Sequence, residues 1–499
     1  MNDEPGSRLR RYAAAGVAVA VMLVSGCTRA GQTQAPSDVL RVALNINPTQ
    51  LNPILTQNTI ESFTDGLIFN ELVTQDAQHH QIPDLAREVP TVANGGVSKD
   101  GLTLVYHLRK GVRWHDGAPF TSKDVVFTWH AIMNPNNNVV SRRGYDQIAS
   151  MTTPDPYTVV MHMKRLFSPA IDTIFGESDT PMKILPEHLL ARYPNLNHVA
   201  FNAAPVGTGA YRFVRWLRSD HIELAANANY FKGRPHFARL LLKIIPDDNT
   251  MLAQIRAHEV DLALEIPAPV YRDASGAPGV TRQLASAPVY TAVQFNTQKS
   301  PLDDPRVRRA LVMGIDRQQI VRDDSYGTAT VAVADLSPYY WAFDRSLSPI
   351  PYDPNGAKAL LDAAGWHPGP DGVRTKNGRR LSLLYVYGTG SQLVRTIIAQ
   401  VQQMYRPLGI EVQLKGYDYA TLYAAAQSGG ILNGGRFDMA MYSWVSGADP
   451  DDSSQWTCAA IPPNGNNVSR YCSRQMDALQ RTALSTLDRG VRGKAYAAI

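Results

Sequence analysis

Long apolar runs are scarce in this 499-residue sequence. The uncharged stretch from Tyr12 to Val24 has only 13 residues, whereas a helix needs about 20 apolar residues to cross the hydrocarbon of a bilayer. No later stretch approaches that length. The sequence therefore predicts no membrane-spanning helix, and any attachment to a membrane would need another device.

A strong charge bias is missing as well. The 49 Lys and Arg residues nearly balance the 44 Asp and Glu residues, which leaves a net charge of +5. The basic residues are scattered along the chain, and this argues against a nucleic-acid partner. Hydrophobic residues make up 44% and charged residues 19% of the chain, so a large core is expected and disorder is not. The length predicts two or three domains.

Common catalytic and nucleotide-binding motifs are also absent from the sequence. It has no P-loop, no dinucleotide-binding glycine pattern, no Gly-x-Ser-x-Gly turn, no His-Glu-x-x-His motif and no repeat of fixed period. His115 beside Asp116 would suit an acid–base pair, but the two lie in a turn-rich stretch. His79 and His80 would form a weak surface metal site at best. We expect no enzyme, no cofactor and no metal, with a secreted hydrolase as a remote alternative.

Only three cysteines occur, and the first follows the short apolar stretch. Arginines at positions 8, 10 and 11 precede that stretch, and two small residues separate it from Cys27. A positive start and a short apolar run are typical of a secretory signal. The junction resembles the lipobox of bacterial lipoproteins, in which the cysteine is acylated and becomes the first mature residue. We expect a signal peptide at 1–26, lipidation of Cys27 and a flexible tether at 27–37. An ordinary signal with a stray cysteine is the alternative.

The other two cysteines, Cys458 and Cys472, lie close together near the end of the chain. In an exported protein such a pair favours a disulfide. A metal site is the alternative, but no histidine lies nearby and two thiolates alone rarely hold zinc.

The pattern along the chain mixes strands with helices. Strands are expected at 38–47, 102–108, 158–165, 381–388 and 437–444. Thr121 has the features of a helix N-cap, with Asp124 at the third helical position. A short helix is expected in 184–193, a single long helix over 303–324 and a capped helix over 353–366. These alternations favour an α/β protein with more than one lobe.

Several stretches occur together in the order known from one family: "PVGTGAYRF", "HEVDLALEIP", "DDPRVRRAL", "ALLDAAGW" and "PLGIEVQL". From residue 38 to the end, the chain resembles the extracellular solute-binding proteins, family 5, of ABC transporters, which capture peptides, dipeptides or nickel. The resemblance implies a bilobal α/β fold like that of periplasmic binding proteins, with three subdomains and the ligand between the lobes. Lobe I would comprise 38–72 and 200–296, an accessory subdomain 73–199, and lobe II 297–499.

The same resemblance implies a function. The tail "WTCAAIPPNGNNVSRYCSRQMDALQ" is similar to the dipeptide-binding branch, including its cysteine pair. We expect a monomeric lipoprotein outside the cell membrane that delivers peptides to a membrane permease served by a separate ATPase. A non-peptide ligand (nickel chelate, haem or oligosaccharide) is the alternative, since a fold does not fix its ligand. Family members continue past the point where this sequence stops, with a tail that returns to lobe I. Either the protein is shortened at this end or the sequence is a piece of a longer protein, and we expect a chain without the tail to be less stable and to bind ligand more weakly.

Candidate ligand contacts follow from the family's late strand. Trp444 matches a family tryptophan whose ring can cover ligand side chains. Peptide-binding members place an aspartate three residues later, where this chain has Gly447. Asp449 is the first acid after it, and either reaches the same spot or caps the next turn. Weaker candidates are Asn52, Thr208, Tyr211, Tyr387, Tyr417 and Tyr419, although residues in such turn-rich loops are more often packing or turn residues than ligand contacts.

Overall fold

The computed structural model describes residues 38–499 except 56–58, 140, 286 and 425. The predicted signal peptide, Cys27 and the tether lie outside the described residues. Within the described part of the chain, no helix combines the length and apolar character needed to cross a membrane.

The first sheet has the strand order β10-β1-β9-β8-β7. Its strands are β1 (Val39–Leu44), β7 (Tyr211–Leu217), β8 (His221–Ala226), β9 (Arg239–Ile244) and β10 (Leu262–Ala263). β1 runs parallel to β9 and β10, while β7, β8 and β9 are antiparallel neighbours. Three helices accompany this sheet in sequence: α1 (Thr59–Ile68), α5 (Asp248–Arg256) and α6 (Ala268–Asp273). The strand expected in 38–47 is therefore confirmed.

The segment between β1 and β7 builds a smaller sheet of order β4-β6-β5 and a hairpin. The strands are β4 (Thr103–His107), β5 (Ile148–Asp155) and β6 (Thr158–Met163), with β2 (Val73–Gln75) and β3 (Gln81–Pro83) in the hairpin. Its helices are α2 (Ser122–Met133), α3 (Ala170–Thr173) and α4 (Glu187–Leu190). Thr121 and Asp124 form a reciprocal capping box, as predicted. One continuous apolar core joins this part to the first sheet, with Leu44 and Tyr106 both fully buried in it.

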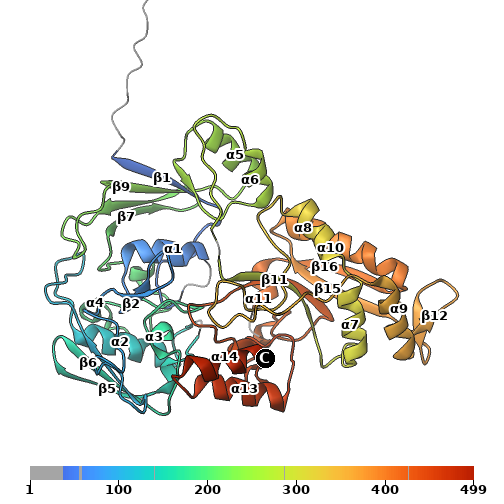
Figure 1. The fold of residues 1–499 in the computed structure, drawn as a ribbon. Coiled ribbons are helices and arrows are strands. Elements are labelled where there is room, and N and C mark those ends of the chain that lie inside the picture. Colours follow the sequence, from blue (N-terminus) through green and yellow to red (C-terminus); the bar gives the residue numbers. More distant parts are fainter. Residues whose placement is uncertain (1–37, 56–58, 140, 286, 425) are drawn as a thin grey trace, which may run out of the picture. The chain divides into compact units, whose positions relative to one another are not determined.

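The second sheet has the order β11-β17-β15-β16. Its strands are β11 (Val289–Phe295), β15 (Ser382–Gly388), β16 (Glu411–Tyr417) and β17 (Met439–Val445). β15 is parallel to both β16 and β17, and β11 is antiparallel to β17. The strand β11 lies within the range 200–296 that the family resemblance assigns to lobe I, but it pairs with β17 in this second sheet (Figure 1).

Helices cover one face of the second sheet: α7 (Pro305–Met313), α9 (Pro354–Ala363) and α10 (Gln392–Tyr405), whose buried Leu311, Leu361 and Ile398 share a core with Tyr385. A separate cluster on the opposite face contains Val386, Ala440 and Leu422. Leu422 belongs to the short helix α11 (Tyr419–Tyr423). A small sheet of β12 (His367–Pro368), β13 (Arg374–Lys376) and β14 (Arg379–Arg380) follows α9.

The prediction of a single helix over 303–324 is wrong, because the chain breaks into α7 and α8 (Arg317–Asp324). A β-carbon on Gly314 would lie 2.5 Å from Leu408 Cδ1, so the chain packs tightly against η3 (Arg406–Leu408) at this point. The side chain of Asp316 then accepts a hydrogen bond from the backbone nitrogen of Gln319 and caps the new helix. Tertiary packing and a cap together end the first helix.

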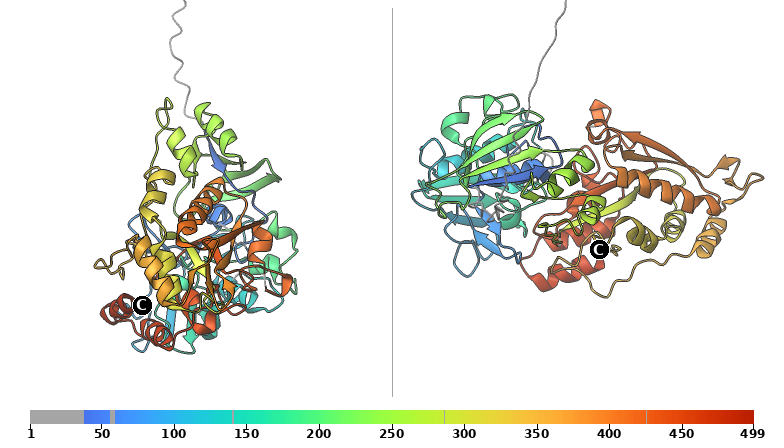
Figure 2. Two further views of the ribbon diagram at one scale, coloured as in Figure 1. Left: turned by 90° about the vertical axis from the view of Figure 1, so that its right-hand side faces the viewer. Right: turned by 90° about the horizontal axis from the view of Figure 1, so that it is seen from above.

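The C-terminal part is helical and crosslinked. It contains α12 (Ser453–Trp456), α13 (Arg474–Leu484) and α14 (Arg489–Ala498). The predicted disulfide between Cys458 and Cys472 is present. Ser168, just before α3, donates hydrogen bonds from its backbone nitrogen to Leu484 O and from its hydroxyl to Ala483 O. The helices α13 and α14, coloured red, accordingly lie beside the segment between β1 and β7 in Figure 1 and Figure 2.

Candidate functional site

The candidate site is centred on the end of β17 and on residues 446–452, which we call the 446–452 loop. Trp444 lies opposite Tyr290 of β11 in the antiparallel register, so the two side chains share one face of the sheet. The Tyr290 hydroxyl donates a hydrogen bond of 2.5 Å to Gln455 Oε1. Burial is the main cause that raises the pKa of Tyr290 far above its usual range. Trp444 itself is half-buried.

The 446–452 loop touches the segment that follows α3. The backbone nitrogen of Ala448 donates a hydrogen bond of 2.7 Å to Glu177 O. A β-carbon on Gly447 would lie 2.5 Å from the backbone nitrogen of Asp179. Residue 447 is therefore a glycine because the backbone of another segment occupies the space of a side chain.

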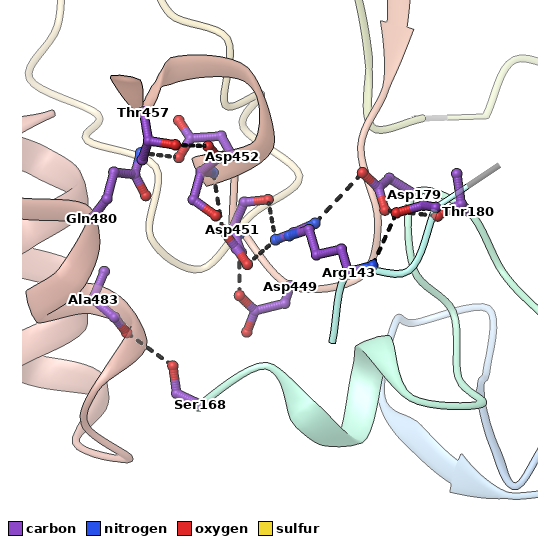
Figure 3. A network of polar contacts seen from close by, with 12 residues as sticks. Arg143, Ser168, Asp179, Thr180, Asp449, Asp451, Asp452, Thr457, Gln480 and Ala483 are labelled. Carbon is purple, nitrogen blue, oxygen red and sulfur yellow. Dashed lines mark hydrogen bonds and ion pairs between the residues drawn. The ribbon is translucent and has the colours of Figure 1, made fainter. Parts of the chain in front are cut away.

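Arg143 joins the loop to that segment through ion pairs. Its guanidinium contacts the carboxylate of Asp451, of whose side chain 2% is exposed, and lies 3.6 Å from the carboxylate of Asp179 (Figure 3). Arg143 also donates a hydrogen bond of 3.4 Å to the backbone oxygen of Asp451. One cation thus bridges two acids that are distant in sequence.

Asp449 is engaged on two sides. Its Oδ1 accepts a hydrogen bond of 3.1 Å from the backbone nitrogen of Asp451, so it does cap the next turn. The same oxygen accepts a hydrogen bond of 2.5 Å from Nη2 of Arg492 in α14. The role of Asp449 as a ligand contact stays a prediction.

A narrow cavity lies among these groups, lined by Arg143, Asp172, Asp179, Gly447, Asp449 and Asp451. It has room for about one water molecule. Burial, followed by the negative charge of Asp449, raises the pKa of Asp172 to about 6. A larger, open depression lies between α8 and α10, where Gln319, Gln392 and Gln403 line it, and none of the predicted site residues is among its lining.

Three of the predicted aromatic residues gather near the carboxyl ends of β15, β16 and β17. Tyr417 and the β17 residue Tyr442 pack on the same cluster beside α11. Trp444 lies two residues after Tyr442 on β17 and therefore shares its face. Tyr419 begins α11 and its ring lies over the Gly388–Gly390 turn. The carboxyl edge of parallel strands is where open α/β sheets bind ligands.

Tyr387 lies on the other face of the second sheet. It packs with the core beneath α7, α9 and α10. A β-carbon on Gly416 would lie 3.1 Å from Tyr387 Cζ, so the ring covers that glycine. The structure therefore does not bring Tyr387 together with Trp444.

The remaining predicted contacts belong to the first sheet and its connections. Asn52 is fully buried and donates a hydrogen bond of 2.9 Å to Asn202 Oδ1. The buried hydroxyl of Thr208 donates one of 2.9 Å to Asn70 Oδ1. Tyr211 is buried at the start of β7. All three fit packing positions, and their contact with a ligand stays a prediction.

The histidines considered from sequence have protein partners. His115 accepts a hydrogen bond from the Gly207 nitrogen through Nδ1, and its Nε2 lies 3.0 Å from Gly209 O. His79 Nδ1 lies 2.8 Å from the Tyr339 hydroxyl. Among the described residues, no group of three or more His, Cys, Asp or Glu side chains is placed to hold a metal ion.

Four charged residues at this site, Arg143, Asp172, Asp179 and Arg492, are not among the candidates predicted from the sequence. Arg143 and Asp451 are 308 residues apart, and neither lies in a motif. Their pairing depends on the tertiary structure alone, so the sequence holds no local signal for it.

Comparisons with known proteins agree over nearly the whole chain. A model of "Bacterial extracellular solute-binding proteins, family 5 Middle" matches residues 81–465. The oligopeptide-binding protein AppA of Bacillus subtilis is 26% identical over 478 residues, which cover 94% of this chain and 84% of AppA. The di/tripeptide-binding protein 2 of Pseudomonas aeruginosa is 27% identical over 492 residues, covering 91% and 87%.

Two solved structures have similar folds. AppA of Bacillus subtilis in complex with a nonapeptide gives a TM-score of 0.81 at 25% identity, covering 92% of this chain and 90% of AppA. NikZ of Campylobacter jejuni in complex with Ni(L-His) gives 0.80 at 26% identity, covering 92% and 89%. These matches confirm the predicted fold class.

Proposed function

Because this chain belongs to the bacterial extracellular solute-binding proteins, family 5, we propose that it captures peptides outside the cell and delivers them to a membrane permease. The observation that carries the proposal is similarity over more than 90% of the chain to two proteins named for peptide binding. A separate ATPase would supply the energy for transport. The chain itself would return its ligand unchanged.

We propose that peptide lies between the first and second sheets, with Trp444 and the 446–452 loop as part of the site. The cavity beside this loop has room for about one water molecule. Entry of a peptide would therefore require the loop to separate from Arg143 and residues 177–179. The contacts to be broken are the hydrogen bond from Ala448 to Glu177 and the ion pairs of Arg143.

Ligand that co-purifies with the mature protein, identified by mass spectrometry, tests the peptide proposal directly. Isothermal titration with di- to nonapeptides should show saturable binding, and incubation should leave the peptides uncleaved. The alternative ligand is a nickel chelate, which the similarity to NikZ favours. A titration with Ni(L-His) distinguishes this alternative from peptide binding. Binding of Ni(L-His) without any peptide binding would overturn the proposal.

For the first 37 residues we keep the proposal of a lipoprotein. It rests on the arginines at 8–11, the uncharged run and the small residues before Cys27. Cys27→Ala should release the protein from membranes or leave its signal uncleaved. Unchanged membrane retention of a cleaved Cys27→Ala protein would contradict it.

The proposed oligomeric state is a monomer, which size-exclusion chromatography with light scattering would check.

A further inference from the structure

Two half-exposed tyrosines lie side by side on α11. The rings of Tyr419 and Tyr423 are stacked, with centroids 6.2 Å apart and an interplanar angle of 29°. The exposed fractions are 49% for Tyr419 and 45% for Tyr423. Aromatic rings gain from covering such exposed faces with another ring or an apolar group.

The local sequence fixes these rings in place. Asp418 caps α11 by accepting hydrogen bonds from the backbone nitrogen and hydroxyl of Thr421, and Leu422 anchors the helix in the apolar cluster. Residues 419 and 423 are four apart, so they project from the same side of the helix. The cap and the buried Leu422 fix the position of α11 and therefore keep both rings exposed.

Glycines make room for the first ring. A β-carbon on Gly388 would lie 2.2 Å from Tyr419 Cε1, and one on Gly390 would lie 2.6 Å from Tyr419 Cε2. Any larger residue at either position would push the ring away. The Tyr419 ring thus packs directly against the backbone of Gly388 and Gly390.

The second ring connects the pair to β17. Tyr423 meets Tyr442 edge to face, with centroids 6.4 Å apart and an interplanar angle of 90°. Tyr442 and Trp444 alternate with Ser443 along the strand and so point to one face of the sheet. The aromatic row therefore runs from Tyr419 to the tryptophan that we place at the ligand.

We propose that Tyr419, Tyr423 and Tyr442 form a subsite that receives an aromatic side chain of the bound peptide. The inference rests on the proposed function and adds the class of peptide. The row lies at the carboxyl edge of the parallel strands β15, β16 and β17, where ligands of open α/β sheets bind. A ring placed there would meet both a ring face and a ring edge, the two favoured arrangements of aromatic pairs.

The test compares the purified protein with its variants against one mixture of di- to nonapeptides, with retained peptides quantified by mass spectrometry. The parent protein should retain peptides with Phe, Tyr or Trp about tenfold better than matched peptides with Ala, as expected for burial and stacking of a ring. Tyr423→Ala should reduce this preference to about twofold. Tyr423→Phe keeps the ring and should keep the preference.

Tyr352→Ala is the matched control, because Tyr352 is also 49% exposed and lies outside the row. It should leave the preference unchanged. The subsite would be overturned if Tyr423→Ala weakened the retention of all peptides equally, or if the parent protein retained peptides without any preference for aromatic ones. Either result would leave the proposal of peptide capture intact. Retention of no peptide by the parent protein would overturn the proposed function and the subsite together.

Discussion

Arg492 of α14 donates a hydrogen bond of 2.5 Å to the carboxylate of Asp449, and less than a tenth of either side chain is exposed. Burial lowers the pKa of Arg492, but the charge and hydrogen bond of Asp449 outweigh that effect and leave it raised. The negative charge of Asp449 is thus compensated within the chain. A peptide amine that approached Asp449 would compete with Arg492 for it.

Substitutions of Asp449 and Arg492 should have strongly non-additive effects on the unfolding free energy. Asp449→Asn leaves the buried guanidinium of Arg492 without its counter-charge, so we expect a loss of about 2 kcal/mol in unfolding free energy. Arg492→Gln should cost a similar amount. The double variant should recover about 1–2 kcal/mol of the summed loss, since it removes both charges. Urea unfolding of the four proteins measures the coupling.

Peptide titration of the same proteins separates stability from binding. If Asp449 also binds the amino terminus of a peptide, Asp449→Asn should weaken the binding of a peptide with a free amino terminus by about 1.5–3 kcal/mol. The binding of the same peptide with an acetylated amino terminus should not change. Equal affinity for the free peptide in Asp449→Asn and the parent would remove Asp449 from the ligand site.

Local signals explain what the sequence predicted well. The N-cap at Thr121 and the strand expected at 437–444 depend on neighbours in the chain, and both elements are present. The break between α7 and α8 has a local part, the Asp316 cap of α8, which the sequence offered, and a tertiary part, the packing of Gly314 against Leu408 about ninety residues later, which it could not show. The same holds for Arg143 and Asp451, whose pairing no spacing could indicate.

Gly447 offers a test of the contact between the 446–452 loop and the segment after α3. Its φ is not positive, so an alanine there strains only the packing against Ser178 and Asp179. Gly447→Ala should lower the unfolding free energy by about 1–3 kcal/mol, the usual cost of overpacking. Thermal unfolding measures the change.

Gly66 in α1 is the control glycine, because a β-carbon there would meet nothing within 4 Å. Gly66→Ala should stabilise the protein by about 0.5–1 kcal/mol through the helix preference of alanine. A Gly447→Ala protein as stable as the parent would show that the loop and the segment do not pack in solution as they do in the structure.

The disulfide should contribute to stability through the chain that it closes. Cys458 and Cys472 are 14 positions apart in the sequence, and closing a loop of this length is worth about 3 kcal/mol in the chain-entropy model. Replacing both cysteines with serine should lower the unfolding free energy by about that amount. Alkylation of the unfolded, unreduced mature protein should label neither residue. Two labelled thiols in freshly exported protein would contradict the pairing.

Asp172 predicts a dependence of stability on pH. An aspartate has an ordinary pKa of about 3.9, and burial with the charge of Asp449 raises that of Asp172 to about 6. The folded chain therefore holds this proton more tightly than the unfolded chain does. Between about pH 4 and pH 6 the unfolding free energy falls as pH rises, and the full cost of the ionised carboxylate is present above that window.

Asp172→Asn removes this cost while keeping an oxygen that can accept the 2.7 Å hydrogen bond from Gln81 Nε2. The variant should be more stable than the parent by about 1–2 kcal/mol at pH 7.5, and the two should have similar stability at pH 4. Urea unfolding at both values measures the difference. Asp303→Asn is the control. Asp303 is exposed, so this substitution removes the same charge from the protein without removing a buried carboxylate. An advantage of Asp172→Asn that is equal at both pH values would show that charge burial is not its cause.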